Sequence, residues 1–372
     1  MKIALVILHA DPARGGAERY TVDLADALAK NGHSVSMLAS TFAPLPQGVT
    51  QVSLPAAGMT RKGQYLNFLD SLDAHLDRTK YDIVHAMLPV RRCDFYHPHA
   101  GLAVMPDRRG PITALFNPRR SAMATIERRL LGASHPPRVL CLSQYVKLAF
   151  KRFYPLNDAH LPVLFNAVDT TKFDPNAGAK TPHEKIIALM IAQDFERKGL
   201  AATIEALARI DDKNLILRVV GKEDTSKYQR LAAGLKVADR IQFAGPTSDP
   251  ASEYRNADFF VLPTRHDPCS LVVLEALAMG LPVISTRLNG ACEIMTEGVH
   301  GFVLSDPADI ASLAKAMQKM MDPGMRSHMS AACLELRANL SYQHHLDRLL
   351  QFYQAVQSAR PRRIAMKGLF DV

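Results

Sequence analysis

A strand, a loop and a helix follow one another in residues 259–280, and this segment constrains the fold more than any other. The apolar run at 259–264 is typical of a buried strand, and the run at 271–280 is typical of a helix. The start of such a helix presents free backbone N–H groups, and its dipole favours an anion there. Two carboxylates, Asp267 and Glu275, stand in the loop and the helix with seven residues between them. The segment therefore predicts a site for a phosphate and for sugar hydroxyls, although a buried α/β crossover is the plainer alternative.

Strands and helices alternate along most of the chain. Apolar runs that predict strands in the first half lie at 2–8, 34–40, 81–87, 139–143 and 163–169, with a helical pattern at 17–30 after the first of them. After a polar stretch at 169–185 the strands resume at 186–192, 215–221, 241–245, 258–263 and 282–286, and a long helix is predicted at 342–358. This alternation predicts two parallel-sheet domains joined by a linker, with the carboxyl ends of both sets of strands facing a cleft.

Composition narrows the class of protein. The 372 residues suffice for two domains, and 48% hydrophobic with 22% charged residues is ordinary for a globular chain. Five scattered cysteines without a C-x-x-C pair argue against a disulfide framework or a zinc site. The apolar run at the N-terminus is short and leads into a glycine turn, so it predicts a strand rather than a signal peptide. No apolar stretch reaches the ~18 residues of a membrane span, and we expect a cytoplasmic monomer.

The net charge of +9 indicates an anionic partner. Between Asp107 and Arg129, six arginines stand against two acids, with apolar residues interleaved. Residues 119–131 fit one amphipathic helix, which suits an anionic lipid surface; a solvated basic face fits the charge equally well. Nucleic acid is not expected, because the chain has no Trp, only 7% aromatic residues and no recognised binding motif.

Two further motifs point to phosphate chemistry. Gly15 and Gly16, followed by Ala-Glu-Arg, stand between the first strand and the first helix, where glycine lets a ligand approach the backbone. A tight βα turn is the alternative, and the G-x-G-x-x-G fingerprint of dinucleotide binding is absent. Arg197 and Lys198, followed by a glycine, stand after the first strand of the second half. A forked donor beside a point charge suits a diphosphate leaving group.

Taken in order, these motifs resemble those of the retaining glycosyltransferases of family 4. The glycine loop is similar to the family's GG-x-E-R loop, the Arg-Lys-Gly sequence to its R/K-K-G element, and Asp267 with Glu275 to its E-x7-E signature. The first signature position is Asp here, which keeps the charge but is one methylene shorter. The sequence N-A-V-D at 166–169 is similar to the family's N-G-V-D. Length, short linker and arginine-rich segment look most like the lipopolysaccharide core glucosyltransferase I group.

The resemblance implies an α/β fold of glycosyltransferase B architecture, with two facing Rossmann-like parallel-sheet domains and a C-terminal helix that crosses back to the first. It implies an acceptor-side domain at 1–168, completed by 345–372, a linker at 169–185, and a nucleotide-sugar domain at 186–344. The family carries a histidine near the donor sugar after a mid-domain strand. This role falls on His99, with His97 as the alternative.

The implied reaction is transfer of a hexose from a nucleoside-diphosphate sugar, UDP-glucose, to a hydroxyl of a glycolipid or lipopolysaccharide-core acceptor. The family needs no metal or other cofactor, and the enzyme would work at the inner face of the cytoplasmic membrane. Catalytic roles are expected for His99, Arg197, Lys198 and Asp267. Substrate-binding roles are expected for Gly15, Gly16, Glu18, Asp94, Cys269, Ser270, Leu271, Val272 and Glu275. The alternatives are a GDP-mannose-dependent mannosyltransferase and a non-catalytic basic protein that binds membrane or nucleic acid.

Overall fold

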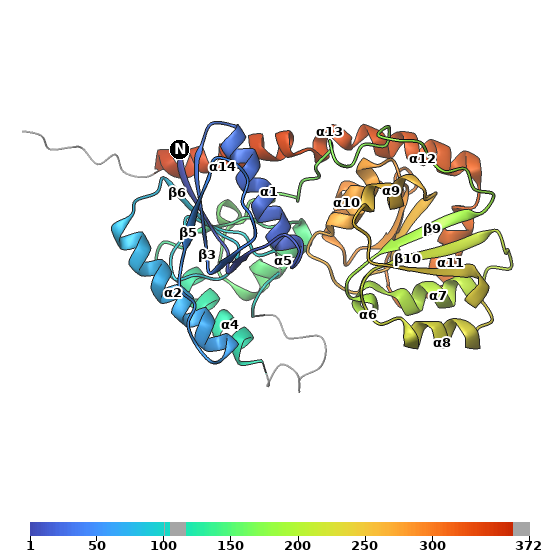
Figure 1. The fold of residues 1–372 in the computed structure, drawn as a ribbon, viewed down its shortest axis with the longest axis horizontal. Coiled ribbons are helices and arrows are strands. Elements are labelled where there is room, and N and C mark those ends of the chain that lie inside the picture. The colour runs from blue at the N-terminus through green and yellow to red at the C-terminus, as the bar shows by residue number, and fades with distance from the viewer. Residues whose placement is uncertain (100, 105–116, 360–372) are drawn as a thin grey trace, which may run out of the picture.

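Two six-stranded sheets, each with all strands parallel, form the centres of two domains (Figure 1). The computed structural model describes residues 1–99, 101–104 and 117–359. The first sheet has the order β5-β3-β1-β6-β7-β8 and the second has the order β11-β10-β9-β12-β13-β14. The predicted α/β class with two parallel-sheet domains is confirmed. The strands β1 and β9, at the centre of the two sheets, are almost continuously apolar because helices cover both of their faces.

The N-terminal domain contains strands β1 (Lys2–Val6), β2 (His9–Ala10), β3 (Ser34–Ala39), β4 (Thr41–Phe42), β5 (Val49–Ser53), β6 (Ile83–Ala86), β7 (Phe95–Tyr96) and β8 (Arg138–Val139). Its helices are α1 (Gly16–Lys30), α2 (Arg61–Arg78), α4 (Pro118–Leu131) and α5 (Gln144–Phe153), with a 3-10 turn η1 (Asp158–His160). The short strands β2 and β4 pair with each other beside the main sheet.

The C-terminal domain contains strands β9 (Ile186–Ile191), β10 (Leu215–Val220), β11 (Ile241–Gly245), β12 (Phe259–Leu262), β13 (Val283–Thr286) and β14 (Gly301–Leu304). Its helices are α6 (Phe195–Lys198), α7 (Leu200–Ala208), α8 (Ser226–Gly234), α9 (Pro250–Arg255), α10 (Leu271–Ala278), α11 (Ile310–Lys319), α12 (Pro323–Glu335) and α13 (Arg337–Leu340). The 3-10 turns η2 (Ala238–Arg240) and η3 (Gly290–Ile294) and the final helix α14 (Tyr342–Ala359) complete the described chain.

Two predicted strands differ from the structure. The strand expected at 139–143 is only Arg138–Val139, because Ser143 already caps α5 by accepting from the Val146 N–H. The strand expected at 163–169 is wrong. Val163 forms an isolated bridge with Cys141, which follows β8, and Val168 forms one with Ser341, which precedes α14. An apolar run that passes from one domain to the other has no single sheet to join.

The last helix, α14, packs against the N-terminal domain. In Figure 1 it runs from the C-terminal domain back along the top of the first domain. Leu346, Leu349 and Tyr353 are buried in the same apolar cluster as Ile3 and Leu28. Described helices include none that is both long and apolar enough to cross a membrane.

Four histidines are enclosed where α14, α1 and the first sheet meet. His85 Nδ1 is 2.6 Å from the Tyr353 hydroxyl, and His345 Nε2 is 2.7 Å from the Tyr20 hydroxyl. His97 lies between them, with its ring centroid 5.2 Å from that of His85 and 4.3 Å from that of His99.

Burial keeps all four imidazoles uncharged. It lowers the pKa of His85 to about 3, of His99 to about 3 and of His345 to about 4. Burial also lowers the pKa of His97 well below its ordinary value. The packing of α14 on the first domain thus depends on neutral histidines.

We expect stability to fall in mild acid. Below pH about 6.5, the ordinary histidine pKa, these histidines bind protons in the unfolded chain but not in the folded chain. The free energy of unfolding therefore decreases. Each buried histidine should cost about 1.4 kcal/mol of unfolding free energy at a pH of about 5.5. His85→Gln should therefore reduce the acid loss by this amount in urea denaturation at pH 7.5 and 5.5. Exposed His135→Gln is the control. Equal pH dependence of His85→Gln and the wild type would contradict the assignment.

Candidate active site

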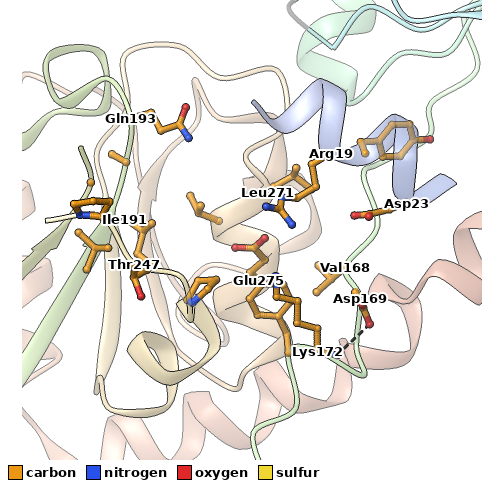
Figure 2. A pocket seen from close by; sticks show the side chains of 18 of the residues that line it. Arg19, Asp23, Val168, Asp169, Lys172, Ile191, Gln193, Thr247, Leu271 and Glu275 are labelled. Carbon is orange, nitrogen blue, oxygen red and sulfur yellow. Dashed lines mark hydrogen bonds between the residues drawn. The ribbon is translucent and has the colours of Figure 1, made fainter. Parts of the chain in front are cut away.

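A cavity of about 280 Å³ lies between the two domains (Figure 2). The first turns of α1 form one wall with Arg19, Tyr20 and Asp23, and the linker adds Asp169 and Lys172. The opposite wall is made by the carboxyl ends of β9 and β10, by the loop after β11, and by α10. Residues from these elements include Ile191, Gln193, Gly221, Lys222, Thr247, Leu271, Val272 and Glu275. Parallel sheets place such a cleft at their carboxyl edges.

Glu275 of α10 points into this cavity, where Arg19 and Lys172 face it from the other wall (Figure 2). The hydroxyl of buried Tyr254 donates to Glu275 Oε2 over 2.8 Å and fixes the carboxylate. Burial raises the pKa of Glu275, and the charges of Lys172 and Arg19 act against this rise. The carboxylate keeps lone pairs for hydroxyl donors of a ligand.

The loop before α10 contains a buried ion pair. Lys198 Nζ and Asp267 Oδ2 are in direct contact, and each residue is only 8% exposed. Arg197 stands beside them: its Nη1 donates to the His266 carbonyl over 2.7 Å and lies 3.9 Å from Asp267 Oδ2. The Arg197 side chain remains 40% exposed, and its Nε also pairs with Asp194 Oδ2 over 3.0 Å. Three charged residues predicted to act together therefore meet at one point.

The N-terminus of α10 has features that suit the binding of an anion. Ser270 is its N-cap residue, yet its side chain caps no backbone N–H. The Ser270 hydroxyl is buried without a hydrogen-bond partner among the residues that the structure describes. A buried hydroxyl without a partner is costly unless a ligand binds it. The neighbouring Cys269 thiol is buried, which raises its pKa and keeps it protonated.

The glycine loop approaches α10 from the first domain. A Cβ at Gly16 would lie 3.3 Å from Leu271 Cδ1, a tight contact, so the glycine loop packs closely on the start of α10; Gly15 is the N-cap of α1. Glu18 does not line the cavity; Arg19, the next residue, does. The glycine loop therefore leads to the cavity as predicted, but the side chain that lines the cavity is Arg19 and not Glu18.

His99 lies behind the cavity wall. Its ring centroid is 4.3 Å from that of Tyr20, which lines the cavity, and His99 Nε2 is buried without a hydrogen-bond partner within the described chain. His97 lies deeper and is fully buried. Asp94 is not brought to the site: it precedes β7, and its carboxylate accepts from the Val84 N–H over 2.8 Å at the amino end of the sheet.

Several cavity residues were not predicted from the sequence. Asp23, Asp169, Lys172, Gln193 and Thr247 come from a helix, the linker and two loops, and no shared spacing connects them. Asp169 alone had a signal, as the last residue of N-A-V-D at 166–169. In the described residues, no three His, Cys, Asp or Glu side chains are placed to hold a metal ion.

The sequence matches two families of catalytic domain. Residues 14–172 match the family "Glycosyltransferase Family 4", and residues 174–343 match "Glycosyl transferases group 1". The chain therefore belongs to the two-domain glycosyltransferases of the group 1 and family 4 type, and it is an enzyme. This excludes the non-catalytic alternative.

Individual relatives support the same assignment. The D-inositol 3-phosphate glycosyltransferase of Thermobifida fusca is 26% identical over 95% of this chain and 93% of its own length. The lipopolysaccharide glucosyltransferase WaaG of Escherichia coli is 23% identical over 82% of this chain and 86% of that protein. A crystal structure of WaaG superimposes with a TM-score of 0.78 at 20% identity, covering 92% of this chain and 98% of that one. That structural likeness shows the shared fold.

We expect Glu275→Ala to weaken binding of a nucleoside diphosphate by about 1–3 kcal/mol, the usual contribution of a charged hydrogen bond. The variant removes the carboxylate that faces the cavity. Titration calorimetry with UDP and with GDP measures the change, and Glu335→Ala, exposed on α12, is the matched control. A dissociation constant equal to that of the wild type would show that Glu275 does not contact the nucleotide.

Proposed function

We propose that this glycosyltransferase retains the anomeric configuration and moves glucose from UDP-glucose to a hydroxyl of a glycolipid or lipopolysaccharide-core acceptor. The observation that supports it most is the joining of Arg197, Lys198 and Asp267 beside the open start of α10, next to a cavity that contains Glu275. Relatives that include a lipopolysaccharide glucosyltransferase support the substrate class.

In the proposed reaction the bond between the sugar carbon and the diphosphate oxygen breaks first. The diphosphate keeps the electron pair, and Arg197 with Lys198 stabilises its added negative charge. The acceptor hydroxyl then bonds to the same face of the sugar and gives its proton to the departing phosphate oxygen. Asp267 holds Lys198 in place. His99, in the acceptor-side domain, is the histidine expected near the donor sugar and the attacking hydroxyl.

The donor is tested by turnover assays with UDP-glucose and GDP-mannose and a lipopolysaccharide-core or lipid-linked acceptor. We expect UDP-glucose to be consumed with retention of configuration, as followed by NMR of the product. Consumption of GDP-mannose alone would favour the mannosyltransferase alternative. Absence of turnover with every nucleotide sugar would contradict the proposal.

Arg197→Ala should lower turnover about a hundredfold while changing the affinity for UDP much less, since leaving-group charge is greatest in the transition state. Arg197 is the cleaner choice, because removing Lys198 would also leave Asp267 buried without a counter-charge and destabilise the fold by about 3–5 kcal/mol. Steady-state kinetics with calorimetry separates the two effects. A raised Michaelis constant at unchanged turnover would show that Arg197 only binds the donor.

An acceptor with an anionic group is supported by two arginines at helix starts. Arg61 stands in the first turn of α2, and Arg119 stands in the first turn of α4. Neither of these first turns contains an acidic residue. The helix dipole disfavours a cation there. Arg119 Nε is buried without a hydrogen-bond partner among the residues described. A phosphate or carboxylate of the acceptor would supply the hydrogen-bond acceptor that Arg119 Nε lacks among the described residues.

We also propose that the N-terminal domain docks on anionic lipid at the inner face of the cytoplasmic membrane. Arg128 and Arg129 of α4 are exposed, and on α5 the apolar residues Leu148 and Phe153 are 66% and 41% exposed beside basic Arg152. The structure changes the charge balance expected from the sequence. Glu127, one of the two acids of the segment, is fully buried. Arg108 and Arg109 lie outside the described residues.

Replacing Arg128, Arg129, Lys151 and Arg152 with Gln should abolish sedimentation with anionic vesicles and spare turnover on a soluble acceptor. Four basic residues at about 1 kcal/mol each give reversible binding that weakens as salt shortens the ~10 Å screening length. The control replaces Arg209, Lys236, Lys315 and Lys319, which are exposed on the C-terminal domain. Vesicle binding that ignores both salt and the first set of changes would contradict the proposal.

A further inference from the structure

Side chains of the N-terminal domain hold the loop that contains Asp267, although this loop belongs to the C-terminal domain. Ser143 Oγ donates to the Pro268 carbonyl over 2.7 Å, and Asn166 Nδ2 donates to the Cys269 carbonyl over 3.0 Å. Both donors are buried, at 0% and 5% exposure. These two hydrogen bonds cross the domain boundary at the centre of the site.

Three more hydrogen-bond contacts surround them. The hydroxyl of Tyr145 lies 2.7 Å from His266 Nδ1, at the beginning of the same loop. The N–H groups of Gln144 and Tyr145, at the start of α5, donate to the carboxylate of Glu293 over 2.6 Å each. The first turn of α5 is therefore fastened to the C-terminal domain.

The C-terminal domain supplies the other hydrogen bonds of this loop. Asp267 N–H donates to the Leu288 carbonyl over 2.9 Å, and Arg197 donates to the carbonyl of His266. The Asp267 carboxylate accepts the Cys269 N–H over 3.2 Å. The two backbone groups of Cys269 are therefore bound by different domains. Its N–H is bound by the C-terminal domain, and its carbonyl is bound by the N-terminal domain.

Packing leaves this loop little freedom while the domains are engaged. Gly290, beneath the loop, has no room for a Cβ between the Pro268 carbonyl and the side chain of Ser143. Gly101 of the first domain lies against Pro268 and His266. If the domains separate, the Pro268 and Cys269 carbonyls lose their buried donors together.

We propose that Ser143 and Asn166 are positioning residues, which place the Asp267 loop for catalysis only when the two domains are engaged. The two residues act through the loop backbone and do not touch substrate. Engagement of the acceptor-side domain thus completes the Asp267, Lys198 and Arg197 arrangement in the donor-side domain. The kinetic part of this inference rests on the proposed transferase function; its structural part does not.

The structural part is tested by thiol alkylation resolved by mass spectrometry. Cys269 is 5% exposed in the loop, and Cys333 is 0% exposed in α12, so the second thiol monitors global unfolding. Asn166→Ala and Ser143→Ala should accelerate alkylation of Cys269 about fivefold or more, as expected for local opening, and leave Cys333 unchanged. Unchanged reactivity of Cys269, or equal acceleration at both thiols, would overturn the proposal.

The control variant is Asn256→Ala. Asn256 Nδ2 makes a hydrogen bond of the same 3.0 Å length to the Ser252 carbonyl, and its Oδ1 accepts the Thr181 N–H of the linker over 2.8 Å. It tests the loss of a side-chain amide bond away from the loop, and neither thiol should react faster. Acceleration of Cys269 in this control would overturn the assignment to Asn166.

The kinetic part compares turnover with nucleotide binding in the same variants. We expect turnover to fall about tenfold or more, because a small displacement of a catalytic group is costly. The dissociation constant for UDP should change less than about twofold, since the contacts of α10 remain.

Unchanged turnover, or a loss of UDP affinity that matches the loss of turnover, would overturn the positioning role. If the wild type transfers sugar from no nucleotide donor, the proposed function fails instead. The Cys269 measurement still decides the loop proposal in that case.

Discussion

All strands in the two main sheets run parallel, and the rest of the molecule follows from this constraint. Each strand must be followed by a connection that returns the chain to the amino edge, so the helices begin at the carboxyl edge. Both domains therefore direct helix N-termini and loops toward the cleft. The start of α10, with its backbone N–H groups, therefore lies near arginine side chains at the cleft, where an anionic ligand can bind. The cavity of about 280 Å³ lies between these edges.

Electrostatics at the cleft is set by burial as much as by charge. Lys198 and Asp267 are buried together, and such a pair is stabilising only while both members are present. Arg197 stays partly exposed beside them, with its Nε paired to Asp194 Oδ2 over 3.0 Å. Glu275 is kept in place by a neutral tyrosine, Tyr254, which donates a hydrogen bond to its carboxylate. The Asp267 carboxylate thus orients Lys198, and the Glu275 carboxylate remains available to hydroxyl groups of a ligand.

The two domains are joined in two different ways. Along the first domain, α14 fastens the end of the chain through apolar contacts and the bonded pairs His85–Tyr353 and His345–Tyr20. At the cleft, hydrogen bonds from Ser143 and Asn166 connect the domains through a loop of the active site. Buried apolar contacts give a durable connection. A few hydrogen bonds that water can replace are more easily broken and remade.

The sequence by itself determined the class of fold, and it predicted the loop and helix around which the candidate site is built. Apolar periodicity predicted most of the strands and the helices at 17–30 and 342–358, because both are local properties. The loop and helix at 267–280 were readable because phosphate binding uses neighbouring residues in one short segment. Only the tertiary structure decided that Arg19 rather than Glu18 reaches the cavity, that Asp94 lies at the other edge, and that residues 163–169 join no sheet. Such outcomes depend on helix rotation and on contacts such as Asn166 with Cys269, 103 positions apart, which packing alone decides.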